Sequence, residues 1–342
     1  MYEGLRKPEE LITLVVALLA NGCPVQAIVR TFGLDERTVA HWLSRAGAHC
    51  EHVHHELIVQ AKLDLQHVQV DEIYAKGCKL VAWVAMAIMV PTRLWLGGVV
   101  SPSRDHHLTD ELLRLVRACC LRLSALLICC DGFAAYPKSI ARAFSDKVPN
   151  PFGTGRHRLQ GWPEILVGII NKHRQNKRLV QVTREMLVGG ITRAVEILQE
   201  TCTGNTLNTA FIERFNGTLR ERLATFTRRC RHAAHRHERL AAGMWLVGSL
   251  YNWCVPHRQL SRREAFAQGR RGEVLLTPAM ASGLTDHVWS VHELLSYRRT
   301  PAALPPAKRG PGRPRKQPPS DPPGTAVRKR KLSCEVSCAS TI

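Results

Sequence analysis

The chain has 342 residues, of which 45% are hydrophobic and 22% are charged, a balance that excludes a wholly disordered chain or a coiled-coil rod. Lysine and arginine number 48 against 28 acidic residues, and the formal net charge of +20 at pH 7 favours a polyanionic partner such as nucleic acid. The polar first residues do not resemble a signal peptide, and the longest apolar stretch, 80–90, is too short to cross a bilayer. We therefore expect a cytoplasmic protein with free thiols and no membrane partner.

Residues 1–50 predict a small all-α domain. Apolar residues at helical spacing indicate helices over 8–20 and 24–32. Gly33 allows a tight turn because glycine adopts positive φ without strain, and Asp35 is a typical N-cap for a third helix. Three helices in this order are typical of a helix-turn-helix DNA-binding domain.

The third helix would present Arg37, Thr38 and His41 near its N-terminal end, where helix-turn-helix proteins usually contact base edges. The alternative is a three-helix bundle that only packs against the rest of the chain, since this segment is electrically neutral. We favour the DNA-binding interpretation because the turn glycine, the cap and a buried tryptophan occur in register.

A linker is predicted over 51–65, and a group of possible zinc ligands surrounds its start. Imidazole and thiolate are common ligands of zinc. This stretch lacks a Cys-x-x-Cys pair, however, so we favour clustered surface histidines over a zinc site. The residues concerned are His49, Cys50, His52, His54 and His55.

From residue 66 the pattern changes to an α/β domain, which we expect to extend to residue 255. Three strands with short connections indicate an antiparallel meander, and a helix then leads into a buried strand, as in α/β layer folds. The expected strands are 67–74, 80–90, 94–100 and 124–130. The expected helices are 105–122, 134–144, 205–226 and 236–253. Residues 147–200 form a less regular, basic, strand-rich region.

Three acidic residues stand in settings that suggest a metal site. Asp71 lies inside an apolar strand, where a carboxylate is costly unless it is paired, hydrated or bound to a cation. Asp131 ends a fully apolar strand, at the position where α/β sheets bind ligands. Glu213 shares a helix face with Asn216 and Arg220. Each residue alone has a structural alternative, a turn cap or a solvated flank, so the hypothesis depends on their combination.

The ordered segments VDEIYA, ICCDGFAAYP and NTAFIERFNGTLRERL resemble the catalytic motifs of bacterial insertion-sequence transposases of the DDE class. The resemblance covers about residues 8–255. It implies a ribonuclease H-like fold, a mixed sheet flanked by helices, with an N-terminal helix-turn-helix that binds element ends. It also implies double-stranded DNA as partner, both element ends and target, and a homodimer or higher oligomer on DNA in the bacterial nucleoid.

The resemblance implies Asp71, Asp131 and Glu213 as catalytic ligands of Mg²⁺ (or Mn²⁺), with Asn216 and Arg220 as DNA contacts. The best-known members place the glutamate much closer to the second aspartate. A closer acid, Glu164, precedes a strand-like run and lacks a polar helical face. We therefore prefer Glu213 and interpret 147–200 as an insertion that adds DNA contacts.

The C-terminal part divides into an extension over 256–300, to which no chemistry is assigned, and a disordered basic tail over 301–342. The tail contains a Gly-Arg-Pro core between basic residues that resembles an AT-hook. Its Arg313 and Arg315 would lie in a narrow minor groove, which concentrates negative potential. The alternative is a plain polycationic tail.

These features predict a transposase that cleaves phosphodiesters and joins 3′-hydroxyl ends to target DNA by two-metal in-line transfer. One alternative is a DNA-binding regulator built on a retired transposase core, and another is a metal-dependent nuclease without joining activity. Tyr136, close to Asp131, suggests a tyrosine recombinase, but no cluster of arginines and histidines surrounds it in the sequence. A structural or DNA-contact role is preferred for this tyrosine.

Overall fold

The computed structural model describes residues 1–76, 80–149, 153, 156–176, 178–223, 226, 236–267 and 274–298. The predicted tail over 301–342, with Arg313 and Arg315, lies outside these residues. The segment Met1–Arg299 packs as one unit, so the N-terminal helices and the sheet belong to the same body. No helix in the described ranges has the length and apolar character that crossing a membrane requires.

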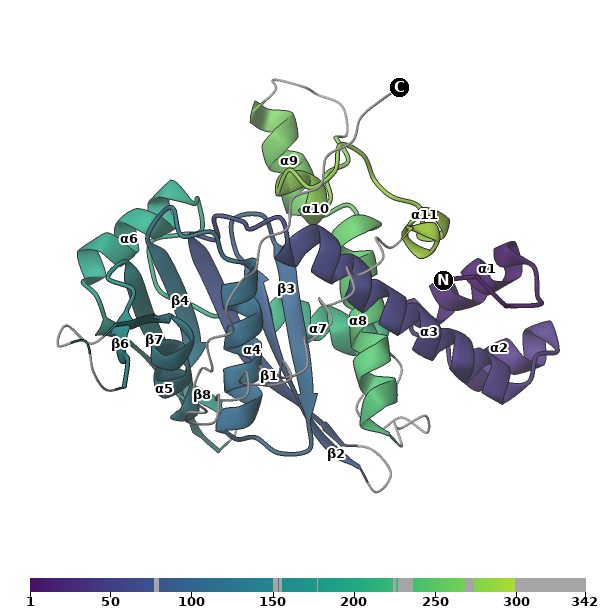
Figure 1. Ribbon diagram of the computed structural model, residues 1–342, viewed down its shortest axis with the longest axis horizontal. Coiled ribbons are helices and arrows are strands. Elements are labelled where there is room, and N and C mark those ends of the chain that lie inside the picture. Colours follow the sequence, from purple (N-terminus) through teal and green to yellow (C-terminus); the bar gives the residue numbers. More distant parts are fainter. Residues whose placement is uncertain are drawn as a thin grey trace, which may run out of the picture. The chain divides into compact units, whose positions relative to one another are not determined.

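Six strands form one mixed sheet (Figure 1). They are β1 (His67–Lys76), β2 (Val81–Met89), β3 (Leu94–Ser101), β4 (Leu126–Asp131), β7 (Ile165–Gln175) and β8 (Arg178–Val188). Their order across the sheet is β3-β2-β1-β4-β7-β8. β1, β2 and β3 form the predicted antiparallel meander, and the predicted crossover helix, α4 (His106–Cys119), leads into β4, which joins β1 in parallel. The four predicted strands are therefore confirmed.

β7 places part of the region 147–200, which was interpreted as an insertion, within the central sheet. Its first six residues pair in parallel with β4, from Ile165 opposite Leu126 to Ile170 opposite Asp131. The run ILVGII is apolar throughout, as is typical of a strand buried on both faces of a parallel sheet. The strand-like run expected after Glu164 is therefore present, and polar residues continue the same strand to Gln175. The region also contributes β8 to the same sheet, and a separate two-stranded sheet is formed by β5 (Ser145–Val148) and β6 (Arg158–Gly161).

Helices flank both faces of this sheet (Figure 1). Adjacent glycines of β3 mark the two faces, because a side chain at Gly97 would meet Leu115 of α4 and one at Gly98 would meet Met244 of α8. α5 lies beside α4, and α7 lies beside α8. Three of these helices confirm predicted ones: α5 (Ala135–Ala143), α7 (Ala210–Arg222) and α8 (His237–Trp253). A further helix is α6 (Ile191–Glu200).

Three helices precede the sheet, as predicted: α1 (Glu9–Ala20), α2 (Val25–Phe32) and α3 (Glu36–His54). Gly33 ends α2 at a left-handed φ of 60°. The Asp35 side chain caps α3 by accepting hydrogen bonds from the amides of Arg37 and Thr38. The turn glycine and the helix cap of the prediction are therefore both present.

The predicted linker over 51–65 is largely helical. α3 continues to His54 and is followed by the π-helical turn η1 (His55–Val59). The cause is tertiary packing, since α3 lies along α8 so closely that a Cβ atom at Gly47 would overlap Ala242. Val53 and Ile58 are fully buried, and their burial stabilises helix beyond the end that was predicted.

The histidines of this region are split between interior and surface. His49 and His54 are buried, whereas His52 and His55 are exposed, so the surface interpretation is wrong for the first two. The ring of His54 lies against two tryptophan rings. Among the described residues, the close group of potential metal ligands is acidic and contains none of these histidines.

Residues 256–300 include the short helices α9 (Arg258–Ala267), α10 (Pro278–Ala281) and α11 (Val291–Ser296). A capping box between Ser290 and Glu293 begins α11, which contacts both α1 and α3. The extension therefore helps to hold the N-terminal helices. Every cysteine in the described ranges is a free thiol, as expected.

Candidate active site

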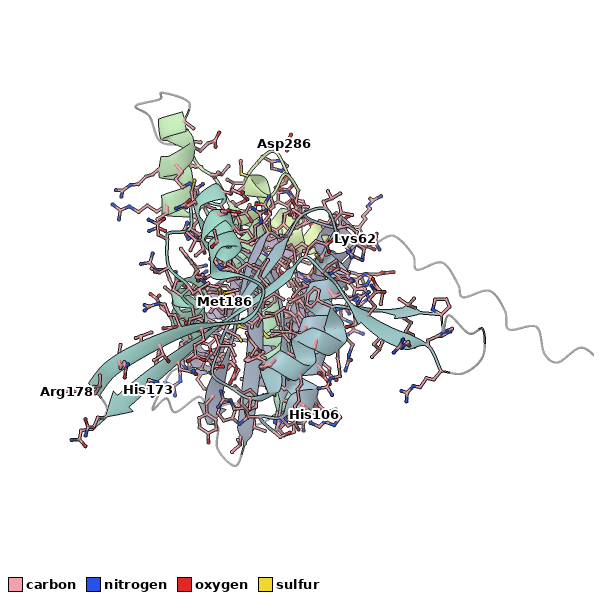
Figure 2. All side chains as sticks on the ribbon, turned by 90° about the vertical axis from the view of Figure 1, so that its left-hand side faces the viewer. Lys62, His106, His173, Arg178, Met186 and Asp286 are labelled. Atoms are coloured by element: carbon pink, nitrogen blue, oxygen red, sulfur yellow. The ribbon has the colours of Figure 1, made fainter. Side chains whose placement is uncertain are left out.

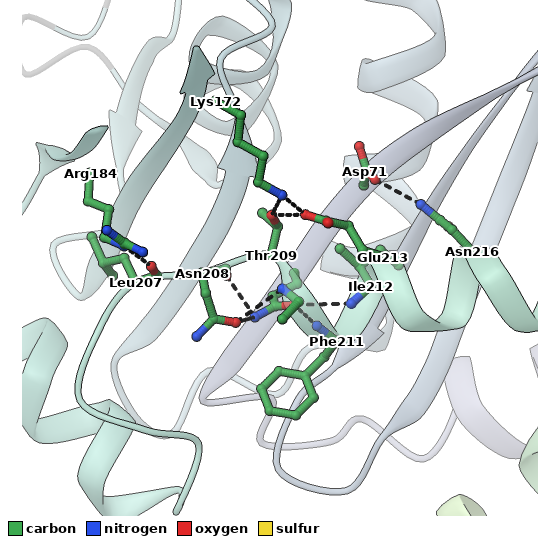
Figure 3. Close-up of polar contacts among 12 residues, drawn as sticks. Asp71, Lys172, Arg184, Leu207, Asn208, Thr209, Phe211, Ile212, Glu213 and Asn216 are labelled. Carbon is green, nitrogen blue, oxygen red and sulfur yellow. Dashed lines mark hydrogen bonds and ion pairs between the residues drawn. The ribbon is translucent and has the colours of Figure 1, made fainter. Parts of the chain in front are cut away.

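The two predicted aspartates lie on neighbouring parallel strands at the carboxyl end of β4. Gln69 of β1 is opposite Cys129 of β4, so Asp71 and Asp131 each follow two residues later. Glu213 reaches the same place from α7 (Figure 3). All three side chains line one open pocket of about 650 Å³. The structure therefore brings together three acids that are far apart in the sequence.

Asp71 is held in a strongly unfavourable environment for a carboxylate. Burial, followed by the nearby carboxylates of Glu72 and Asp131, raises the pKa of Asp71 from 3.8 to about 7. Asn216 donates a hydrogen bond from Nδ2 to Asp71 Oδ2 at 2.8 Å (Figure 3). Asn216 is itself buried, so its amide positions Asp71, while its predicted role as a DNA contact stays a prediction.

Glu72 is a site residue that the sequence reasoning missed. It is buried on the other side of β1, where the Tyr136 hydroxyl donates to Glu72 Oε2 at 2.7 Å. Arg104 pairs with Glu72, and its Nη2 also lies 3.1 Å from Asp131 Oδ2. Burial and Asp131 raise the pKa of Glu72, while Tyr136 and Arg104 oppose the rise. Tyr136 thus has a structural role, as preferred.

The aspartates and Glu72 form an arrangement that fits a divalent cation. Asp71, Glu72 and Asp131 each offer a carboxylate oxygen within 4.8 Å of the others. Hard cations such as Mg²⁺ prefer oxygen ligands of this kind. No described residue donates a hydrogen bond to the buried Oδ1 of Asn216, so this acceptor beside the carboxylates is available to a ligand. A cation here would relieve the repulsion that raises the pKa of Asp71.

Glu213 lies in the same pocket but outside this close group of three. Its carboxylate pairs with Lys172 of β7 and accepts a hydrogen bond from the Thr209 hydroxyl (Figure 3). Lys172 Nζ also lies 3.3 Å from Thr209 Oγ1. Lys172 was missed because its strand was assigned to an insertion, although a lysine two residues after an apolar strand run is a detectable signal.

Gln69 fixes the start of α7 to the sheet. Its Oε1 accepts hydrogen bonds from the amides of Phe211 and Ile212 at 2.9 and 3.1 Å, and its Nε2 donates to the backbone oxygen of Asn208 at 2.8 Å. These amides belong to the first helical turn and have no partner within the helix. Because Gln69 and Asp71 lie on the same face of β1, the strand that carries Asp71 also places Glu213.

Replacing Gln69 by leucine should lower the free energy of unfolding by about 1–3 kcal/mol, because buried backbone groups lose their partners. Urea denaturation of the full chain measures this. Gln181→Leu, at an exposed position of β8, is the matched control and should stay within about 0.5 kcal/mol of the wild type. Equal losses in the two variants would contradict the proposed attachment of α7.

Glu164, the alternative third acid, is excluded by the sheet. It immediately precedes β7, and its backbone oxygen accepts from the amide of Leu126 at 3.0 Å. Leu126 is the first residue of β4 and Asp131 the last, so the strand length of about 20 Å separates Glu164 from the pocket. Its carboxylate instead pairs with Arg122 at 3.2 Å.

The remaining predicted DNA contacts occupy several places. Arg37 and His41 are exposed and Thr38 is half-buried on the first two turns of α3. Arg220 is half-buried on α7, one turn beyond Asn216. The β7–β8 hairpin, which carries His173 and Arg178, extends past the end of β4 (Figure 2).

No family model matches the chain, and no curated protein is significantly similar to it. The functional assignment therefore depends on the arrangement of residues in the pocket and on the motifs of the sequence.

Proposed function

We propose that the chain is a DNA transposase of the DDE class, which cuts phosphodiesters at element ends and joins the resulting 3′-hydroxyls to target DNA. The observation that carries the proposal is that Asp71, Asp131 and Glu213, from β1, β4 and α7, line a single pocket. A meander followed by a helical crossover to a parallel strand supports the ribonuclease H-like fold that the resemblance implied.

Mg²⁺ (or Mn²⁺) is the cofactor that this donor set would hold. Asp71, Glu72 and Asp131, which lie close together, would hold the ion, and Glu213 lines the same pocket. When bound, the metal would stabilise charge on the attacking and leaving oxygens of the scissile phosphate. Arg104 and Lys172 pair with Glu72, Asp131 and Glu213, and a dication would add positive charge beside Asp71, for which no ion pair with a described residue is found.

The side chains of the pocket would orient the reacting groups and bind the DNA backbone during two steps. In the first step water attacks the phosphorus and the bond to the 3′-oxygen breaks, which leaves a 3′-hydroxyl and a 5′-phosphate. In the second step this hydroxyl attacks a target phosphodiester and displaces the target 3′-oxygen. Asn216 orients Asp71 for both steps, and Arg104 and Lys172 attract the DNA backbone to the pocket. The chain itself forms no covalent bond.

The proposal includes recognition of element ends by the N-terminal helices as a helix-turn-helix, with the chain acting as a dimer or higher oligomer on DNA. The capped start of α3, with Arg37 and His41 exposed, supports this part of the proposal. A cytoplasmic, nucleoid-associated location belongs to the same proposal.

Replacing Arg37 by alanine should weaken binding to the preferred DNA sequence by about 1–3 kcal/mol, because an arginine can donate two hydrogen bonds to a guanine. The measurement is fluorescence anisotropy on a duplex selected by the wild type from a random pool, beside an unrelated duplex. Arg6→Ala, which removes an exposed charge outside the helices, is the control. Equal losses on both duplexes would show that Arg37 does not read bases.

The test of the proposed function is incubation of the full chain with candidate element ends, a target plasmid and Mg²⁺, followed by sequencing of the products. Joined molecules with 3′ ends attached to target strands are expected. Cleavage without joining would favour the nuclease alternative. Sequence-selective binding without cleavage would favour the regulator built on a retired core.

A further inference from the structure

A second pocket lies on the opposite face of α7 from Glu213. It has a volume of about 160 Å³ and is bounded by the β2–β3 turn, α7, the end of α8 and the start of α9. Its α7 residues include Phe211, Arg214 and Arg222, which recur at helical spacing, whereas Thr209 and Glu213 face the acidic pocket. One helix therefore separates a pocket rich in carboxylates from a pocket rich in arginines. We refer to the second as the Arg93 pocket.

Arg93 is a buried cation without an anionic partner among the contacts described. It is 6% exposed, at a left-handed φ of 62° in the turn between β2 and β3. Its guanidinium lies 3.7 Å from the ring centre of Phe211 and donates to the backbone oxygen of Val90. Its buried Nε has no hydrogen-bond partner in the part of the chain that the structure describes. Burying an unpaired charge is costly, so such a group normally faces an anion.

The other residues around this pocket increase the positive charge. Arg214, Arg222 and Arg258 also line it, and no acidic side chain of the described ranges does. Burial lowers the pKa of Arg93 to about 10; Tyr251 opposes this shift, while Arg263 and Arg214 add to it. Within the described ranges, the Nδ1 atom of His257 is a further buried nitrogen without a hydrogen-bond partner.

We propose that the Arg93 pocket binds a phosphate group, supplied by the backbone of the DNA that α7 contacts on its other face. Guanidinium groups match the oxygens of a phosphate, and several of them here converge on one space. That the phosphate belongs to DNA rests on the proposed function. DNA is favoured over a free phosphate because Arg214 and Arg258 are exposed, so a long strand can reach the pocket. Bound phosphate would hold α7 in place on the face opposite Glu213, and so would also fix the position of Glu213.

Two measurements in EDTA test this without any cleavage. The first is the affinity of the full chain for a duplex across a salt series, with Arg214→Gln and Arg258→Gln beside Arg239→Gln. Arg239 is an exposed arginine of α8 that does not line the pocket. Each pocket variant should bind DNA about tenfold more weakly near 0.1 M salt. The slope of log affinity against log salt concentration should become shallower by about 0.9, which is the change expected for one lost phosphate contact. The control should change neither.

The second measurement is the melting temperature with added inorganic phosphate, which should rise for the wild type and Arg239→Gln but not for Arg214→Gln. Loss of both effects in the pocket variants supports a DNA phosphate site. Loss of the phosphate effect with unchanged DNA affinity would overturn the DNA source and leave a site for a free phosphoryl ligand. Pocket variants that behave like Arg239→Gln in both assays would overturn the proposal. DNA cleavage by the acidic pocket is tested by its own experiment, so this result would not decide it.

Discussion

Changing Asp71, Asp131 or Glu213 singly to the matching amide should lower the rate of DNA strand cleavage by about three orders of magnitude or more, with DNA affinity nearly unchanged. The three side chains line one pocket, and each amide keeps the shape of the residue while removing its charge. The measurement is cleavage of a labelled duplex in Mg²⁺ under single-turnover conditions, with affinity determined in EDTA.

Combinations of these substitutions should cost little more than the single ones, because groups that act as a unit are strongly non-additive. Glu164→Gln is the matched control, since this acid lies at the other end of β4 and should be dispensable. Full activity in Glu213→Gln would remove this residue from the catalytic group. Loss of activity in Glu164→Gln with the fold intact would contradict the geometry of the sheet.

Asp71→Asn should make the metal-free protein more stable at pH 8, by up to about 4 kcal/mol. The pKa of Asp71 is raised to about 7 by burial and by neighbouring carboxylates, against 3.8 when unfolded. Between these values the folded chain keeps a proton that the unfolded chain releases, so the free energy of unfolding falls as the pH rises. The amide carries no charge and avoids this loss.

Urea denaturation in EDTA at pH 4.5 and pH 8 measures the effect, which should be small at the lower pH and large at the higher. Adding Mg²⁺ at pH 8 should stabilise the wild type more than the variant, since binding to the folded state adds to its stability. The same difference between wild type and Asp71→Asn at both pH values would contradict the electrostatic account of the pocket.

The central strands were predictable because their patterns are local. The meander and β4 appear as apolar runs between turn residues, and Asp71, Asp131 and Glu213 stand out as acids in apolar settings. The helix cap at Asp35 was also readable, since it satisfies amides only two and three residues away.

The features that were missed depend on contacts between distant segments. The end of α3 is set by α8, and the burial of His49 and His54 follows from that packing. Gln69 gives no sign in the sequence that it accepts from the first turn of α7. Arg104 and Glu72 are 32 residues apart and meet only in the folded chain. β7 was expected only as part of a strand-rich region, because its place beside β4 depends on pairing between distant segments.

The most direct test of the central claim, that these carboxylates hold the catalytic metal, is the metal preference of Asp131→Cys. Thiolate is a softer ligand than carboxylate and disfavours Mg²⁺ more than Mn²⁺. Strand cleavage by this variant should be nearly absent in Mg²⁺ and should return in part in Mn²⁺, whereas Glu164→Cys should match the wild type in both. Wild-type cleavage by Asp131→Cys in Mg²⁺ would contradict a metal-binding role for Asp131.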